Sequence, residues 1–120
     1  MKTAAALAVA AALIGAPQAH AHAVLDHSSP AVGSSVSGAP GAVSMWFTQE
    51  LEPAFSSATV TDASGRNVAS GGAQVDPNDR TELRVPLRPL PPGTYSVAWR
   101  VLSVDTHTTE GHFTFTVGGR

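Results

Sequence analysis

Residues 93–117 read GTYSVAWRVLSVDTHTTEGHFTFTV, two stretches of alternating apolar and polar side chains joined by a short polar segment. The large apolar residues of both stretches occupy every second position: Tyr95, Val97, Trp99, Val101, Phe113, Phe115 and Val117. Successive side chains of a β-strand point to opposite faces, so this period of two predicts two strands, each with one buried face. The polar segment between them is then a connection between strands.

Three shorter stretches nearer the N-terminus have the same strand character: AVSMWF at 42–47, SATVT at 57–61 and ELRVPL at 82–87. Turn-forming sequences lie between and after them: DASG at 62–65, SGG at 70–72, DPND at 76–79 and RPLPPG at 88–93. No helical periodicity occurs from Val24 onward. We therefore predict an all-β fold, an immunoglobulin-like antiparallel β-sandwich or Greek-key barrel of about seven strands. Pro86 cannot donate to a strand ladder, which places its strand at a sheet edge.

The first 21 residues have the parts of a secretory signal peptide. Lys2 precedes an apolar run at residues 4–14, which is shorter than the roughly 20 residues that a membrane span needs. Two overlapping cleavage sequences follow, AHA at 19–21 and AHA at 21–23. Cleavage after Ala21 makes His22 the first mature residue and leaves a domain at 22–120, whereas cleavage after Ala23 makes it Val24. Either cut predicts an exported, periplasmic protein.

Composition excludes several classes of function. The chain has no cysteine, which rules out disulfides and thiolate metal ligands. Its only lysine, Lys2, lies in the signal peptide, which leaves six arginines against nine carboxylates in the mature chain. We therefore expect no binding to nucleic acid or to an anionic membrane surface. No further apolar stretch is long enough to anchor the chain, and we expect a monomer.

The segment SVDTHTTEGHF at 103–113 carries the candidate chemistry. Asp105 and His107 are two residues apart, so on extended backbone both project to the same face. A carboxylate and an imidazole suit a borderline metal such as Cu(II) or Zn(II). If His22 is the N-terminus, its α-amine and imidazole add two nitrogen donors that chelate one ion. Together these groups form a tetragonal set of three nitrogens and one oxygen, which favours Cu(II).

The sequence resembles the CopC family of periplasmic copper-resistance proteins over essentially the whole mature chain. The matching segments are HAVLDHSSPAVGSSV at 22–36, FTQELEPAFSSATVTDASG at 47–65 and LPPGTYSVAWRVLSVDTHTTEGHFTFTV at 90–117. The resemblance implies a β-sandwich that binds one Cu(II) ion through an N-terminal histidine, a second histidine and a carboxylate. By position these ligands are His22, His107 and Asp105, and the cleavage site is then after Ala21. A CopD-type inner-membrane copper transporter is the implied partner.

Two departures from the family pattern narrow this expectation. Some relatives hold Cu(I) on a methionine-rich loop, but the only mature methionine here is Met45, which alternates with Val43 and Phe47 as a core residue does. We therefore expect no Cu(I) site. Some relatives also carry a glutamate where this chain has Gln49, so no ligand is named from that segment, and Glu50 is at most an outer contact.

The other polar candidates have simpler interpretations. His27 and His112 are expected at the surface, and Glu50 and Glu52 on a solvated strand end. The favoured function is a non-enzymatic copper protein that sequesters or transfers Cu(II) in copper resistance. Two alternatives stay open at this point: a copper-dependent oxygenase with the same nitrogen ligands, and a metal-free immunoglobulin-like adhesion or assembly module.

Overall fold

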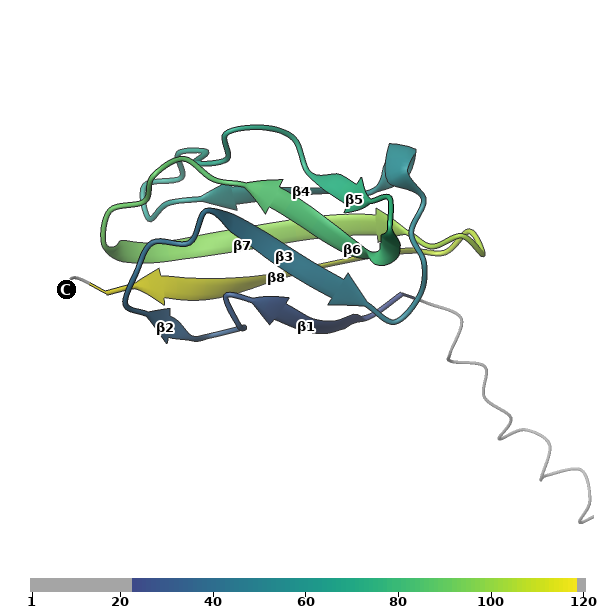
Figure 1. Cartoon of the computed structure of the whole chain (residues 1–120), viewed down its shortest axis with the longest axis horizontal. Helices are drawn as coiled ribbons and strands as arrows, with labels where there is room; N and C mark the ends of the chain where they lie inside the picture. The colour runs from purple at the N-terminus through teal and green to yellow at the C-terminus, as the bar shows by residue number, and fades with distance from the viewer. Residues whose placement is uncertain (1–22, 119–120) are drawn as a thin grey trace, which may run out of the picture.

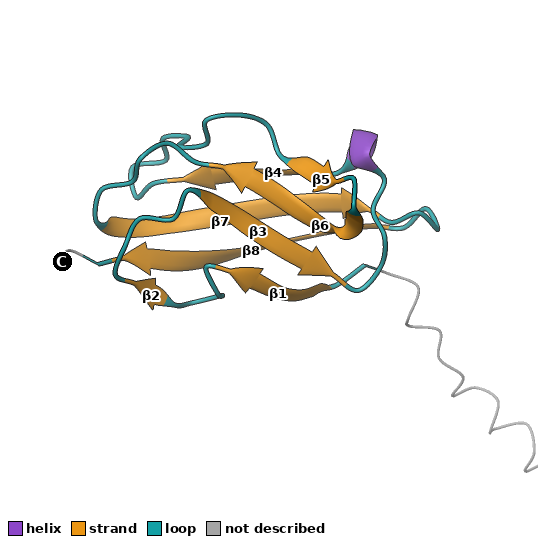
Figure 2. Ribbon diagram, in the orientation of Figure 1, coloured by secondary structure: helices purple, strands orange, loops and turns teal. Residues whose placement is uncertain are grey.

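The computed structural model describes residues 23–118, which fold into a sandwich of two β-sheets (Figure 1). Its eight strands are β1 (Leu25–Ser29), β2 (Ser35–Val36), β3 (Ala42–Phe47), β4 (Ser57–Thr61), β5 (Gln74–Asp76), β6 (Asp79–Pro86), β7 (Gly93–Leu102) and β8 (Thr108–Val117). A short 3₁₀ helix at Pro53–Phe55, coloured purple in Figure 2, precedes β4. No helix in the described part of the chain is long and apolar enough to cross a membrane.

The two sheets have four strands each, in the orders β1-β3-β6-β5 and β2-β8-β7-β4. The predicted all-β sandwich is confirmed, with one more strand than expected. The pairing is also not wholly antiparallel, because β2 runs parallel to β8. The two alternating stretches from which the prediction began form β7 and β8, which pair in register from Gly93 with Val117 to Leu102 with Thr108.

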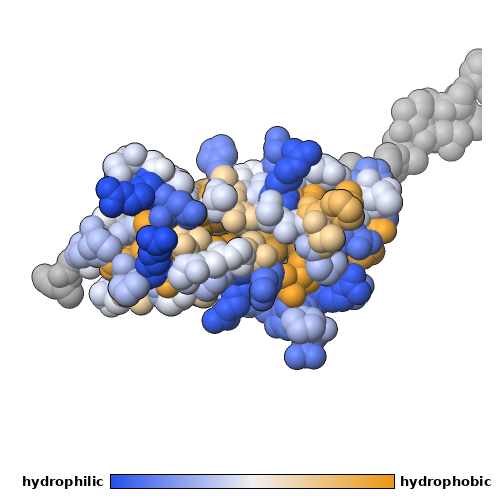
Figure 3. All heavy atoms as spheres, turned by 90° about the horizontal axis from the view of Figure 1, so that it is seen from above, coloured by the Kyte–Doolittle hydropathy of each residue, from blue (hydrophilic) through white to orange (hydrophobic). Residues whose placement is uncertain are grey.

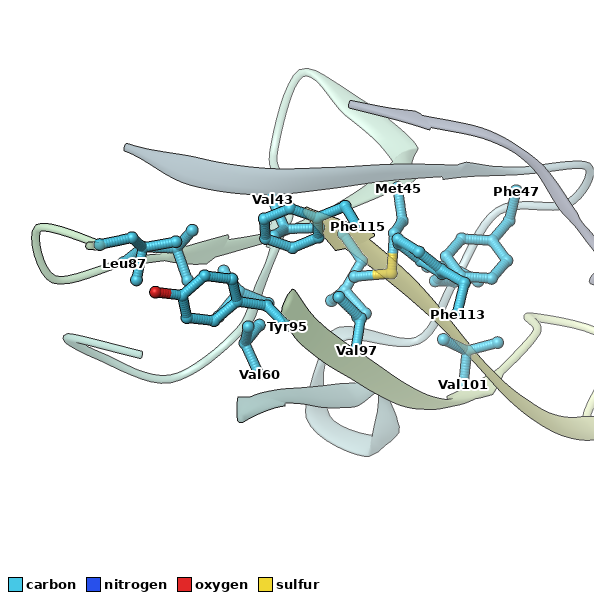
Figure 4. Packing of buried hydrophobic residues seen from close by; sticks show 14 of the residues in the cluster. Val43, Met45, Phe47, Val60, Leu87, Tyr95, Val97, Val101, Phe113 and Phe115 are labelled. Atoms are coloured by element: carbon cyan, nitrogen blue, oxygen red, sulfur yellow. The ribbon is translucent and has the colours of Figure 1, made fainter. Parts of the chain in front are cut away.

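The inner faces of the two sheets enclose one hydrophobic core (Figure 4). Every second residue of the predicted strands points into it, as the period of two requires. The core side chains from four strands, and Leu87 directly after β6, are at most 8% exposed: Val43, Met45, Phe47, Leu83, Val85, Leu87, Tyr95, Val97, Val101, Phe113, Phe115 and Val117. Met45 is completely buried, so its assignment to the core is confirmed.

The prediction that Pro86 marks an edge strand is wrong. Strand β6 lies between β3 and β5 and is therefore internal to its sheet. Pro86 is its last residue, paired with Ala42 of β3, and the register with β5 begins only at Arg84. The missing N–H of proline costs little there, because the ladder to β5 does not reach that residue.

The two tryptophans occupy different environments. Trp46 is half-buried on β3, and its ring stacks on His27 with a centroid separation of 4.6 Å. Trp99 packs against the core edge-to-face with Phe47, at a centroid separation of 5.0 Å. Gly111 on β8 makes room for this indole, since a Cβ atom there would lie 2.6 Å from Cζ2 of Trp99. A glycine inside a strand is here the mark of a close approach.

Figure 3 shows one face of the molecule, on which protruding hydrophilic side chains surround patches of apolar residues. Four large apolar side chains are exposed among the described residues: Val24, Val32, Phe55 and Val104. The loop between β7 and β8 and the start of β1 lie at the same end of the sandwich (Figure 1), whereas β8 ends at the other. The residues predicted to carry chemistry are therefore near the first described residue.

Candidate metal centre

The predicted connection between β7 and β8 is a tight turn, whereas the spacing argument for Asp105 and His107 assumed extended backbone. The amide of Thr106 donates to the carbonyl of Ser103 at 2.8 Å, and the amide of Ser103 donates to the carbonyl of His107 at 3.0 Å. Thr106 has a φ of 75°. Strand β8 begins at Thr108, five residues before Phe113, the first large apolar residue of its alternating stretch. Asp105 and His107 are therefore held by turn geometry.

The turn brings the predicted carboxylate and imidazole together. Nδ1 of His107 lies 3.4 Å from Oδ1 of Asp105, and the two side chains are 45% and 40% exposed. The hydroxyl of Ser103 donates to Oδ1 of Asp105, and this bond, together with the neighbouring His107, lowers the pKa of the Asp105 carboxyl. The carboxylate is thus anionic throughout the neutral range, as a metal ligand must be, and part of it is exposed to solvent.

The N-terminal end of the described chain is fixed beside this turn. Ala23 is fully buried, and its carbonyl accepts a hydrogen bond from the hydroxyl of Thr109 at 2.8 Å. The amide of Val24 donates to the hydroxyl of Thr48 at 3.0 Å, and the amide of Thr48 donates back to the carbonyl of Val24 at 3.0 Å. Thr109 lies two residues after His107, so the backbone just after residue 22 is anchored close to the candidate ligands.

His22 lies outside the described residues. Within residues 23–118, no group of three or more histidine, aspartate or glutamate side chains is arranged to hold a metal ion. The pair Asp105 and His107 therefore supplies two candidate ligands from this part of the chain.

The remaining acidic and imidazole candidates are spread over the molecule. His27 is exposed on β1, where Nδ1 lies 2.7 Å from Oδ2 of Asp26, and His112 is exposed on β8. The predictions that these two histidines lie at the surface are confirmed. Glu50 meets the turn through its backbone, because its carbonyl accepts from the amide of Val104 at 3.0 Å. Glu52 is half-buried, and its amide donates to the carbonyl of Leu102 at 2.8 Å.

Sequence reasoning missed Ser103 and Thr109. Ser103 is completely buried and contacts both members of the pair, and Thr109 binds the Ala23 carbonyl. Ser103 precedes Asp105 and His107 in an i, i+2, i+4 series. This spacing is the one feature of the sequence that could have linked Ser103 to the pair. Nothing in the sequence pairs Thr109 with Ala23, which lies 86 residues away.

The fold and this turn define a small β-sandwich domain with a candidate metal centre at one end. The chain belongs to the CopC domain family, whose model matches residues 25–118. It is 41% identical over 113 residues to protein YobA of Escherichia coli strain K12, covering 93% of this chain and 91% of that protein. It is 37% identical over 106 residues to copper resistance protein C of Escherichia coli, covering 82% of this chain and 83% of that protein.

A solved structure is also similar. The crystal structure of CopC from Methylosinus trichosporium OB3b matches with a TM-score of 0.77 at 35% identity, covering 82% of this chain and 96% of that one. The resemblance to the CopC family and the β-sandwich inferred from it are therefore confirmed.

Proposed function

We propose that this protein binds copper in the periplasm as part of copper resistance. In this proposal the signal peptide is cleaved after Ala21, and one Cu(II) ion is held by the amine and imidazole of His22, by Asp105 and by His107. Copper is the cargo, which the protein stores or hands over without chemical turnover. The family resemblance further suggests delivery to a CopD-type inner-membrane transporter by a monomeric carrier.

The observation that carries this proposal is the docking of Ala23 on Thr109. Consecutive Cα atoms are about 3.8 Å apart, so residue 22 is attached to backbone that is fixed two residues from His107. A terminal amine has an ordinary pKa of about 7.7–8.0, which makes it a much better ligand near neutral pH than a lysine. Cleavage after Ala21 would therefore add two nitrogen donors where a carboxylate and an imidazole already lie together.

The chemistry of the donors supports Cu(II) as the ion. Imidazole and amine nitrogens with one carboxylate oxygen are the ligands that Cu(II) prefers, and affinities along the divalent series peak at copper. The soft thioether donors that favour Cu(I) are represented in the described chain by Met45, which is enclosed in the core. We accordingly propose binding of the oxidised ion.

The test is a Cu(II) titration of the protein that begins at His22 against the same protein with Gly-Ser added in front. The extension removes the free histidine amine and leaves residues 22–120 unchanged. We expect much weaker Cu(II) binding after extension, and fewer nitrogen couplings in the electron paramagnetic resonance spectrum. Equal affinity and identical spectra for the two forms would refute the N-terminal ligand.

A second comparison tests the turn. His107→Ala removes a proposed ligand. Changing a residue that only contacts a ligand typically weakens metal binding by about tenfold to a hundredfold, and we expect a larger loss of Cu(II) affinity here. His112→Ala is the matched control, because His112 is also exposed but lies further along β8. If both alanine variants bind Cu(II) like the parent, His107 is not a ligand.

A further inference from the structure

Ser103 is the one residue of the β7–β8 turn whose side chain is completely enclosed. It is 0% exposed, whereas Val104, Asp105, Thr106 and His107 are all exposed. Its backbone is also fixed, since Ser103 forms a bridge with Leu51. A rigid hydroxyl therefore lies directly beneath the two exposed side chains that we propose as ligands.

The hydroxyl uses both its proton and its lone pairs on those two residues. The proton is donated to Oδ1 of Asp105, and the oxygen accepts from the amide of His107 at 3.3 Å. The carbonyl of His107 already accepts from the Ser103 amide at 3.0 Å, so it does not need the hydroxyl proton. The same side chain thus fixes the carboxylate of one residue and the backbone of the other.

We propose that Ser103 is a positioning residue that presents Asp105 to the metal through a single oxygen. The inference rests on the proposed function, because it concerns the same copper site. A hydrogen bond to Oδ1 fixes the rotation of the carboxylate and leaves Oδ2 as its freer oxygen. Outer contacts of this kind orient metal ligands and raise affinity by ordering the site before the metal binds.

A merely structural role is the competing explanation, and Ser56 provides the matched control for it. Ser56 is 7% exposed, and its hydroxyl accepts from the amide of Leu102 at 3.2 Å, at the same end of β7. The variants Ser56→Ala and Ser103→Ala each remove one buried hydroxyl from this region. Only the second removes a contact to Asp105.

The experiment is a double-mutant cycle on Cu(II) affinity, in the protein that begins at His22. We expect Ser103→Ala to weaken Cu(II) binding by about tenfold to a hundredfold. In an Asp105→Ala background, where no carboxylate remains to be oriented, the same change should cost much less, because only the contact to the His107 amide is lost. Ser56→Ala should leave affinity and the Cu(II) resonance spectrum unchanged, even if it lowers the unfolding temperature.

Two results would overturn the inference. One is equal losses from Ser103→Ala in the two backgrounds, which would show that it does not act through Asp105. The other is a Ser103→Ala variant that folds and matches the parent in affinity and spectrum. Ser103→Thr keeps the hydroxyl and should bind Cu(II) more tightly than Ser103→Ala, even if the added methyl group lowers stability. A failure of the proposed function would look different from a failure of this inference. In that case the His107→Ala protein and the Gly-Ser-extended protein would bind Cu(II) as tightly as the parent.

Discussion

The contact between Gly111 and Trp99 makes a quantitative prediction about stability. In Gly111→Ala, the new Cβ would lie 2.6, 3.0 and 3.3 Å from Cζ2, Cε2 and Cη2 of Trp99. Carbon atoms in favourable contact are about 3.5–4.0 Å apart, so the indole would have to move by roughly an ångström. Phe47, which is 4% exposed, lies edge-to-face against Trp99 and resists that movement.

Two opposing effects set the size of the change. Overpacking of this kind costs about 1–3 kcal/mol. Replacing glycine by alanine also restricts the unfolded chain, which returns about 0.5–1 kcal/mol. Because the closest contact is only 2.6 Å, the clash lies in the upper half of that range, and we expect Gly111→Ala to lower the free energy of unfolding by about 1–2.5 kcal/mol. For a domain of this size, each kcal/mol corresponds to a fall of about 4–8 °C in the unfolding temperature.

Urea unfolding monitored by circular dichroism measures this difference. Gly72→Ala is the matched control, because a Cβ at that exposed position meets no atom within 4 Å, and we expect its stability to match or exceed the parent's. Adding Trp99→Leu to Gly111→Ala removes the ring atoms that clash, so the double variant should lose less than the sum of the single changes. A Gly111→Ala protein as stable as the parent would refute the view that the indole is held in place over β8.

Two further predictions concern individual hydrogen bonds outside the core. The side-chain hydrogen bond from Ser64, with backbone amides of the same turn, lowers the pKa of Asp62 below its ordinary value of 3.8; its stabilising contribution is therefore present above that value and is lost as pH falls through the lowered pKa. Asp62→Asn should accordingly reduce the thermal unfolding temperature at pH 7 and converge with the parent in acid, and a constant difference at all pH values would contradict this assignment. Thr109→Val leaves the buried carbonyl of Ala23 without its donor, so we expect a loss of about 1–3 kcal/mol in urea unfolding together with weaker Cu(II) binding. If Thr109→Val lowers stability but leaves Cu(II) affinity unchanged, the bond to Ala23 does not contribute to the metal site.

The longer strands could be predicted from the sequence, because burial of one face places a large apolar residue at every second position. The stretch AVSMWF coincides with β3 and SATVT with β4, end to end. Strands β2 and β5 have two and three residues, which is too short for a period of two to be recognised. Their existence depends on β8 and β6, the strands with which they pair, and so on contacts between distant segments.

The candidate site was predicted only in part, and for a physical reason. The spacing of Asp105 and His107 identified the pair, but the argument assumed extended backbone. Thr106 instead adopts a φ of 75°, a conformation that β-branched residues rarely take, so local rules favoured the wrong geometry. Ser103 was passed over because the burial of a serine depends on packing that the sequence does not display.

If the protein is exported as we propose, the bond between Thr109 and the carbonyl of Ala23 has a consequence for the order of events during secretion. A chain exported from its N-terminus delivers residue 22 to the far side of the membrane long before residues 105–109 follow. The proposed copper site needs both segments, and β8 must be in place to hold them together. A partly translocated chain, or one cut short before β8, therefore lacks the site. In the proposed function, copper would therefore bind only to chains that have crossed the membrane completely and folded into the sandwich.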